Sequence, residues 1–382
     1  MKLLVISVGY PSEHEPYKYV FVQRLVNELV DHGNECTVIC PTRTKLFSKG
    51  VDRVERQITA KGNEVEVFFP HFTCIYTTSR FKGDFIRKFS VNNCVNAVKR
   101  CIAENKIEFD AVYAHFLGEA AICAIEVGKQ YGKKTVAAAG ESHFTDFDSK
   151  DKDSIIKKLR ELDGIVSVSS QNKKILIKNG VASEDNIITV PNGVDTGIFY
   201  PHDRKESRKA FGFSPSDFIV GFTGYFIDRK GPDRVLAASD GLDLKIAFAG
   251  KGELKPKLKG SNVIYCDSVD PKQMSVFLSA CDIFVLPTKD EGCCNAIIEA
   301  MACGLPIVSS NCEFNDDILN EECSLRIDPE DIGQIHDAIA ELRDNDELRQ
   351  RLSEGAVGQG RSLSISERAN RIADFIAKTM EG

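Results

Sequence analysis

The sequence predicts an α/β protein of two domains, each built on a doubly wound parallel sheet. Three observations lead to this prediction. The chain has 382 residues, more than one hydrophobic core usually supports. Short apolar, β-prone runs alternate with longer helical patterns, as in parallel sheets covered on both faces. The alternation occurs in two series, separated by a turn-rich and then charged stretch from Pro191 to Ser207.

The first series consists of apolar runs that predict buried strands. They are Leu3–Val8, Cys36–Ile39, Val65–Phe69, Ala111–Ala114, Thr135–Ala138 and Ile165–Val168. After the first run, residues 21–30 carry an apolar stripe at helical spacing that ends at Gly33. We therefore expect the first crossover helix there.

The second series has the same character and predicts a second sheet. Its runs are Phe218–Phe222, Ile246–Ala249, Val263–Tyr265, Ile283–Leu286 and Ile307–Val308. After Ile327 the pattern predicts one long helix through about Leu352 and a terminal helix at Ile365–Met380.

Composition bounds the class of protein. An apolar content of 42% with 27% charged residues is typical of a globular protein, and no apolar run approaches the length of a membrane span. The run at Leu3–Val8 is too short for a signal-peptide core, so we expect a cytoplasmic protein. The 13 cysteines are odd in number and lack C-x-x-C spacing, which predicts reduced thiols.

Charge is unevenly distributed. Residues 1–180 contain 27 basic against 22 acidic side chains, net +5, and residues 181–382 contain 22 against 34, net −12. Within the first half, residues 43–100 hold 12 basic and 5 acidic residues with aromatic and aliphatic side chains among them. This mixture suits an anionic membrane surface at the inner face of the membrane, or an anionic acceptor. A merely solvated basic face is the alternative.

The sharpest local pattern reads strand, loop, helix, tight turn and strand between Ile283 and Val308. A helix that begins near Asn295 directs its free amides and positive dipole end to the carboxyl edge of the sheet, where doubly wound folds bind anions. Glu291 precedes this helix and Glu299 lies one turn inside it, so both carboxylates can accept hydrogen bonds from sugar hydroxyls of one ligand. The pattern predicts a diphosphate site, against the alternative of two ordinary solvated acids.

Glu291 and Glu299 have seven residues between them and are followed by Ala300-Met301-Ala302-Cys303-Gly304-Leu305-Pro306, and they resemble the E-x7-E motif of retaining GT-B glycosyltransferases of family 4. The resemblance implies two Rossmann-like domains that face across a cleft. Residues 1–196 would form the acceptor domain, onto which a helix at about 365–382 crosses back, and residues 197–364 the donor domain. It assigns Glu291 to the donor sugar and Glu299 to the ribose. Phosphate would be held by the backbone of Gly292, Cys293, Cys294, Asn295, Ala296 and Ile297.

Further matches follow in the family's order. Pro191-Asn192-Gly193-Val194-Asp195 with Phe199 resembles the segment between the domains, and Gly250-Lys251-Gly252-Glu253 resembles a glycine turn after a strand. The segment Gly224–Gly231 resembles the loop G-R-L-x-x-x-K-G, whose basic residues neutralise the diphosphate. Lys230 matches, whereas Tyr225 stands in place of the arginine, and Arg229 is the substitute that we predict.

The N-terminal half matches less closely. Tyr10-Pro11 and the helix from Phe21 resemble the family's opening, but its usual glycine is replaced near Lys18-Tyr19, and we assign Lys18 to the acceptor side. After Ala138 the family has a histidine beside the reacting sugar, where this chain reads Ala139-Gly140-Glu141-Ser142-His143. Glu141 and His143 are the predicted catalytic substitutes, with His115 as a third candidate on the acceptor side.

The resemblance implies front-face substitution with retention, without a divalent metal or cofactor. A UDP-sugar is the favoured donor, the acceptor is a glycan, a lipid-linked glycan or a small molecule of cell-envelope synthesis, and nucleic acid is not a partner. Asp146-Phe147-Asp148 and Asp151-Lys152-Asp153 imitate the D-x-D manganese motif of another glycosyltransferase fold. They lie in a polar stretch that we interpret as a solvated loop.

Two other functions share parts of this pattern. A nucleotide-sugar epimerase also pairs Rossmann domains with a diphosphate site, and a non-catalytic module could close on a nucleotide sugar. A dehydrogenase is disfavoured because G-x-G-x-x-G follows none of the predicted strands. A glycoside hydrolase is disfavoured because acids flanking a helix N-terminus are poorly placed to straddle a glycosidic oxygen.

Overall fold

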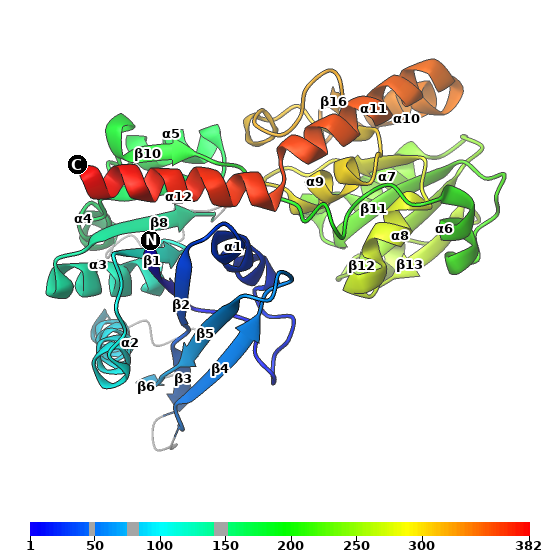
Figure 1. The fold of residues 1–382 in the computed structure, drawn as a ribbon. Coiled ribbons are helices and arrows are strands. Elements are labelled where there is room, and N and C mark those ends of the chain that lie inside the picture. The colour runs from blue at the N-terminus through cyan, green and yellow to red at the C-terminus, as the bar shows by residue number, and fades with distance from the viewer. Residues whose placement is uncertain (46–49, 75–83, 141–151) are drawn as a thin grey trace. The chain divides into compact units, whose positions relative to one another are not determined.

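The structure, a computed structural model, describes residues 1–45, 50–74, 84–140 and 152–382 (Figure 1). The chain divides into two compact units. Unit 1 contains Met1–Val190 and Arg368–Gly382, and unit 2 contains Pro191–Glu367. The division after Val190 lies earlier in the chain than the predicted one after residue 196.

Unit 1 is built around a sheet with the strand order β10-β9-β8-β7-β1-β2-β5-β4. Its strands are β1 (Lys2–Ser7), β2 (Glu35–Ile39), β4 (Arg53–Ile58), β5 (Glu64–Phe69), β7 (Ala111–His115), β8 (Lys134–Ala139), β9 (Gly164–Ser167) and β10 (Ile187–Thr189). Its helices are α1 (Val20–Asp31), α2 (Asp84–Asn105), α3 (Glu119–Tyr131), α4 (Lys152–Leu159) and α5 (Ser170–Lys178). Strand β1 pairs in parallel with β2 and β7 and is buried from Leu3 to Ile6, as expected for a central strand covered on both faces.

Several edge elements of unit 1 differ from the prediction. Strand β4 runs antiparallel to β5, and β3 (Thr42–Lys45) pairs in parallel with β6 (His71–Cys74) in a small separate sheet. Strand β4 has the sequence RVERQI and alternates between half-buried and exposed residues. Such a strand lacks the apolar run that identifies buried strands, so the sequence pattern does not predict it.

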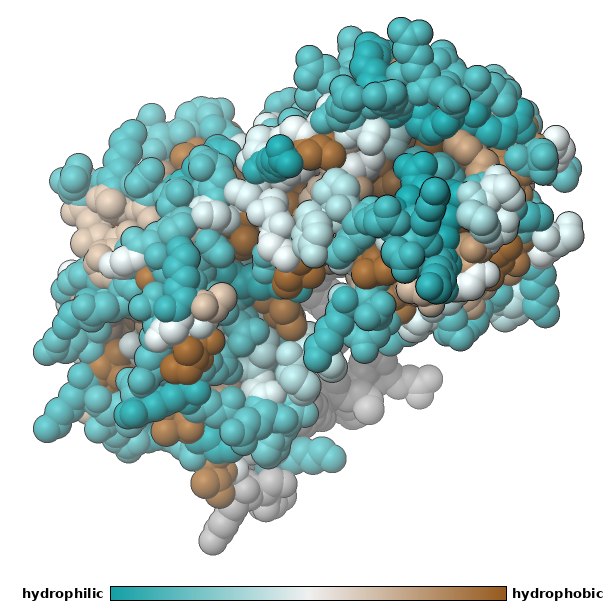
Figure 2. All heavy atoms as spheres, turned by 45° about the vertical axis from the view of Figure 1, so that its right-hand side comes forward, coloured by the Kyte–Doolittle hydropathy of each residue, from teal (hydrophilic) through white to brown (hydrophobic). Residues whose placement is uncertain are grey.

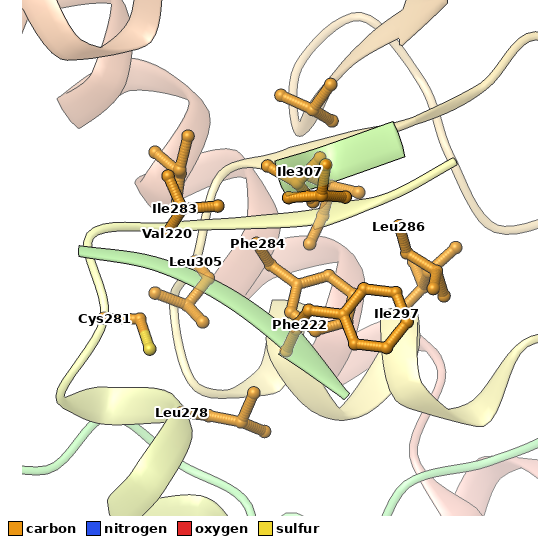
Figure 3. Packing of buried hydrophobic residues seen from close by; sticks show 14 of the residues in the cluster. Val220, Phe222, Leu278, Cys281, Ile283, Phe284, Leu286, Ile297, Leu305 and Ile307 are labelled. Carbon is orange, nitrogen blue, oxygen red and sulfur yellow. The ribbon is translucent and has the colours of Figure 1, made fainter. Parts of the chain in front are cut away.

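Unit 2 contains a parallel sheet with the order β13-β12-β11-β14-β15-β16. The strands are β11 (Ile219–Tyr225), β12 (Lys245–Lys251), β13 (Val263–Asp267), β14 (Ile283–Leu286), β15 (Ile307–Ser310) and β16 (Ser324–Ile327). The helices are α6 (Arg204–Phe211), α7 (Pro232–Ala238), α8 (Met274–Ser279), α9 (Asn295–Ala302), α10 (Ile332–Asp344) and α11 (Asp346–Ser362). In the core, Phe222 of β11 and Phe284 of β14 gather with Ile297 of α9 and Leu278 of α8 (Figure 3).

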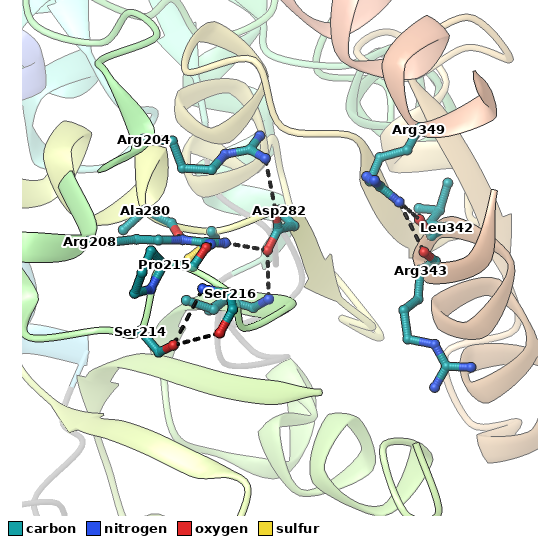
Figure 4. Close-up of polar contacts among 12 residues, drawn as sticks. Arg204, Arg208, Ser214, Pro215, Ser216, Ala280, Asp282, Leu342, Arg343 and Arg349 are labelled. Carbon is teal, nitrogen blue, oxygen red and sulfur yellow. Dashed lines mark hydrogen bonds and ion pairs between the residues drawn. The ribbon is translucent and has the colours of Figure 1, made fainter. Parts of the chain in front are cut away.

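The prediction of one long helix through about Leu352 is wrong. The structure has two helices, α10 and α11, separated at Asn345. The Asn345 side chain accepts a hydrogen bond from the amide of Leu348 at 3.0 Å and so caps α11, while the guanidinium of Arg349 donates to the carbonyls of Leu342 and Arg343 that end α10 (Figure 4). Asparagine is a good N-cap, so the break has a local cause. The terminal helix α12 (Ile365–Glu381) agrees with its prediction.

A buried ion pair fixes the amino edge of the second sheet. Arg208 of α6 donates to Asp282 at 2.6 Å, and Asp282 also accepts from Arg204 and from the amide of Ile219 (Figure 4). Arg208 and Asp282 are only 5% and 7% exposed, so each charge is paired as burial requires. This network ties α6 to the start of β11 and to the loop that leads into β14.

The predicted fold class is confirmed, since both large sheets are parallel apart from β4 and have helices between most of their successive strands. The 13 cysteines are free thiols, and most of them are buried, as predicted. On the face drawn in Figure 2, hydrophilic side chains predominate and apolar ones form small separate groups.

Candidate active site

Two loops meet at the carboxyl edge of the sheet in unit 2. One follows β11 and contains the short 3-10 helix η3 (Asp228–Lys230), and the other connects β14 to α9. The amide of Lys289 donates to the carbonyl of Arg229 at 2.9 Å, which joins them directly. Glycines in β12 and just after it let the chain there lie against the end of β11 and the loop that follows, because a Cβ at Gly250 would lie 1.9 Å from the Gly224 oxygen and one at Gly252 would lie 2.4 Å from the Phe226 oxygen.

Glu291 is the centre of the site. Its Oε1 atom accepts from the Lys230 ammonium at 2.5 Å, from the Arg229 guanidinium at 2.8 Å and from the Thr288 hydroxyl at 2.8 Å. The Lys230 and Glu291 side chains are 11% and 12% exposed, so this pair is largely withdrawn from water. The structure therefore brings together three of the predicted site residues and adds Thr288, which is fully buried and was not predicted.

Arg234 holds the η3 loop in place and was also missed. Its guanidinium donates to the carbonyls of Asp228 and Pro287 at 3.0 and 2.9 Å, and the residue is 8% exposed. Gly231 has φ 69° and leaves the space that this side chain fills, because a Cβ there would lie 2.3 Å from the Arg234 Nη2 atom. A buried arginine that joins two loops has no local sequence signal.

Helix α9 begins where the pattern placed it, at Asn295. The side chain of Asn192 donates to Asn295 Oδ1 at 2.8 Å, and the Asn192 amide lies 3.3 Å from the Cys293 sulfur. The predicted turn segment at Pro191 is thus bonded to the start of α9. Burial raises the pKa of the Cys294 thiol, so Cys294 is a neutral neighbour of Lys230.

The other predicted donor-side residues surround this helix end. Gly292 is buried, Ala296 lies in the first turn of α9, and Glu299 lies one turn further along, half-buried. Tyr225, which stands in place of the family's arginine, is 60% exposed. Arg229, the predicted substitute, reaches Glu291 instead.

The predicted N-terminal candidates have different surroundings. Lys18 pairs with Glu15 at 2.8 Å on the surface. His115, the last residue of β7, is 6% exposed, and burial lowers its pKa to about 3, so the imidazole is neutral at physiological pH. Glu141 and His143 lie outside the described residues, as do Asp146, Asp148 and Asp151.

Two further predictions concern metal and membrane. Across the described ranges, no group of three or more His, Cys, Asp or Glu side chains is arranged to hold a metal ion. None of the helices in the part of the chain that the structure describes is long and apolar enough to cross a membrane. Arg43 and Lys99 pair with Glu119 and Glu126, two acids from outside the 43–100 stretch, so the positive excess is smaller than the residue count suggests. Binding to an anionic surface stays a prediction.

Two family models match the chain. The model of glycosyl transferases group 1 matches residues 203–358, which include the site around Glu291, and that of Glycosyltransferase Family 4 matches residues 20–197. Among sequence relatives, the chain is 24% identical over 352 residues to TuaC of Bacillus subtilis, a glycosyltransferase assigned to teichuronic acid biosynthesis. The alignment covers 89% of this chain and 88% of TuaC.

Solved structures agree with this family at the level of the fold. Sucrose-phosphate synthase from Thermosynechococcus elongatus has a TM-score of 0.77 at 16% identity and covers 99% of this chain and 98% of its own. Anabaena HepE, solved in complex with UDP-glucose, has a TM-score of 0.72 at 15% identity and covers 99% and 100%. With both halves matched by family models and the fold shared over the full length, the chain is a glycosyltransferase of group 1 with the GT-B fold.

Proposed function

We propose that this chain is a retaining, metal-independent glycosyltransferase that moves a sugar from a nucleotide-diphosphate donor to a glycan or lipid-linked acceptor in cell-envelope polysaccharide synthesis. The observation that carries the proposal is the convergence of Lys230, Arg229 and Thr288 on Glu291 beside the amino end of α9.

The charges of this cluster suit a diphosphate leaving group. Two cations share one carboxylate, which leaves a net charge of about +1, and a helix N-terminus adds about +0.5. Breaking the bond between sugar and diphosphate builds negative charge on the phosphate oxygens. Fixed positive groups that are already in place stabilise that charge without reorganisation.

Because these positive groups stabilise the leaving phosphate, the proposed reaction does not need a strong base from the protein. In the proposed step the acceptor oxygen attacks the anomeric carbon on the face from which the phosphate departs, and the departing phosphate oxygen takes the acceptor's proton. The C–O bond to phosphate breaks as the new glycosidic bond forms. Glu291 is positioned to accept hydrogen bonds from donor sugar hydroxyls, and Glu299 is the predicted ribose ligand.

The donor and the pathway are inferred from the relatives. UDP-glucose bound to HepE supports a UDP-sugar here, and the assignment of TuaC supports a role in an envelope polymer. Because nucleotide sugars are made in the cytosol, we retain the prediction that the protein works in the cytoplasm.

A calorimetric binding screen of UDP-, GDP- and ADP-sugars tests the proposal, run with and without a chelator. We expect one donor series to bind equally well in both conditions and Lys230→Ala to weaken that binding at least tenfold, since a charged hydrogen bond contributes about 1.5–3 kcal/mol. Lys289→Ala is the matched control, because Lys289 lies at the same sheet edge but pairs with Asp228 and Glu330. Binding that requires a metal ion, or equal losses in the two variants, would contradict the proposed site.

Transfer itself is tested with the donor found in that screen. Product formed only when an acceptor is present, with the anomeric configuration of the donor kept, agrees with a retaining transferase. Conversion of the donor without any acceptor would identify an epimerase instead.

A further inference from the structure

An aromatic cluster lies at the carboxyl edge of the sheet in unit 1, where β1 and β7 end side by side. Ser7 and His115 are register partners in these strands, and the residues that follow them lead to the cluster. It consists of Tyr19, Phe21, His115 and Phe116, whose ring centroids lie 4.8–6.1 Å apart in tilted and edge-to-face pairs.

The backbone of this cluster is unusual. Among the described residues, three that are not glycine have positive φ, and two of them are Tyr19 at 54° and Phe116 at 80°. An aromatic side chain cannot stabilise the left-handed backbone conformation by a local hydrogen bond, so both positions are strained. Their rings contact each other at 5.9 Å, so two strained positions are held in one place.

Glycines make room for both rings. A Cβ at Gly9, after β1, would lie 2.3 Å from the Tyr19 ring, and one at Gly140, after β8, would lie 3.1 Å from the Phe116 ring. The glycines after β1 and β8 therefore leave room for these two rings to pack directly against the backbone. The residue just before α1 has a left-handed backbone conformation, which glycine adopts most easily. In this chain that residue is Tyr19.

Phe21 is the residue through which the aromatic cluster is exposed to solvent. It begins the exposed side of α1, packs against the three other rings, and is still 42% exposed. An apolar ring that is supported from behind and open in front resembles the lining of a ligand site more than a core position.

The chemistry around the ring favours a sugar as its occupant. The adjoining segment 13–18 is exposed and polar, and it contains the Lys18–Glu15 pair and the exposed Tyr17. A pyranose presents an apolar C–H face and a rim of hydroxyls. The apolar face can stack on one aromatic ring, and the hydroxyls can bond to polar groups around that ring. A lipid chain would need a longer apolar surface.

We propose that the aromatic cluster is the acceptor subsite, on which the apolar face of an acceptor pyranose stacks against Phe21. This inference rests on the proposed function and adds the chemical class that the acceptor presents. Tyr19 and Phe116 are positioning residues for Phe21.

The chain contains no tryptophan, so Phe21→Trp introduces a single tryptophan at the subsite, whose emission can be excited at wavelengths that tyrosine does not absorb. The matched control is Phe89→Trp, a similarly exposed phenylalanine of unit 1 on α2. The probes are the methyl glycosides of glucose, galactose, mannose and N-acetylglucosamine. We expect at least one probe to shift the tryptophan emission of the Phe21→Trp variant saturably and to leave that of the Phe89→Trp variant unchanged. The proposal is overturned if no probe shifts the emission of the Phe21→Trp variant, if both variants respond alike, or if UDP alone gives the same shift.

A second substitution separates binding from a structural role. Adding Tyr19→Gly to Phe21→Trp removes one supporting ring and leaves a residue that accepts φ 54°. We expect glycoside affinity to fall about three- to tenfold, as for loss of an aromatic pair, without a lower unfolding temperature. Unchanged affinity would contradict the positioning role. Calorimetry with nucleotide sugars on Phe21→Trp reports separately on the proposed function, because absent donor binding would reject that function and leave the glycoside result intact.

Discussion

Thr288 gives the most direct test of the proposed donor site at the scale of a single residue. Its hydroxyl is buried and donates to the same Glu291 oxygen that Lys230 and Arg229 contact. Thr288→Val keeps the side-chain shape and removes this donor. We expect kcat/KM to fall about tenfold, since a hydrogen bond to a charged group contributes about 1.5 kcal/mol or more.

The control for this variant is Ser309→Ala. Ser309 is equally buried and donates to the carbonyl of Leu286, but it does not contact Glu291. Steady-state kinetics of both variants, with their unfolding temperatures, distinguish a lost contact from lost stability. If the two variants lost activity equally, Thr288 would have no particular role in positioning Glu291.

His115 predicts how stability depends on pH. Its pKa is lowered by burial to about 3 in the folded protein, whereas an unfolded histidine titrates near 6.5. Below pH 6.5 the unfolded chain therefore binds a proton at this histidine that the folded chain does not. The free energy of unfolding decreases as the pH is lowered from about 6.5 to about 3. Between pH 7.5 and pH 5 the loss from this residue is about 2 kcal/mol.

His115→Gln removes this titration. In urea unfolding at pH 7.5 and pH 5, we expect the variant to lose about 2 kcal/mol less stability between the two pH values than the unaltered protein. Equal losses would mean that His115 is accessible to protons in the folded state.

Local sequence patterns predicted those residues of the candidate site that belong to recognisable motifs. Glu291 and Lys230 belong to motifs, and Arg229 was inferred because a cation was missing at Tyr225. Asn192 and Arg234 could not be assigned in the same way, because their roles arise from contacts between loops far apart in the chain. Thr288 lies three residues before Glu291, but no motif marks its hydroxyl as a donor to that carboxylate. Their residue types, a threonine after a strand and an asparagine in a turn, are common in many loops.

At the scale of the elements, α11 offers a paired test of close packing. A Cβ at Gly360 would lie 2.7 Å from the backbone nitrogen of Ala302 in α9, whereas one at Gly358 would meet nothing within 4 Å. Gly358→Ala should stabilise the protein by about 0.5–1 kcal/mol through helix propensity. Gly360→Ala should destabilise it, because backbone rather than a flexible side chain must move.

Urea unfolding measures both variants, and donor binding measures what the second does to α9. We expect weaker donor binding in Gly360→Ala alone, since α9 carries the helix end of the proposed site. A stabilising Gly360→Ala would show that the two helices can separate at no cost.

The elements that were predicted are those with a continuous apolar run. The buried strands of both sheets and the terminal helix have such runs or a clear helical stripe, and their predicted limits differ from the structure by a few residues. Strands β3, β4, β6, β10 and β16 were missed because they are short or lie at sheet edges, and their half-buried or polar residues resemble a loop. The break at Asn345 was missed because the apolar stripe resumes after it.

At the scale of the whole molecule, the charge of residues 43–100 predicts an interaction with anionic surfaces. We expect the protein to float with phosphatidylglycerol vesicles at low salt and to be released near 1 M salt, where the Debye length falls to about 3 Å. Vesicles of phosphatidylcholine are the control. Flotation that is equal on both lipids would mean that charge does not drive the binding, and flotation on neither would mean that this stretch does not bind anionic surfaces.

Helix α12 has a consequence for synthesis on the ribosome. Arg368 and Arg371 donate to the carbonyls of Val190 and Thr189, and the Phe375 ring lies against Gly164, so the last residues complete the unit that begins the chain. Residues 368–382 leave the ribosome after all of unit 2. Unit 2 can fold as soon as Glu367 has emerged, whereas unit 1 waits with its β9–β10 edge uncovered until α12 follows. Unit 1 is therefore begun before unit 2 and completed after it.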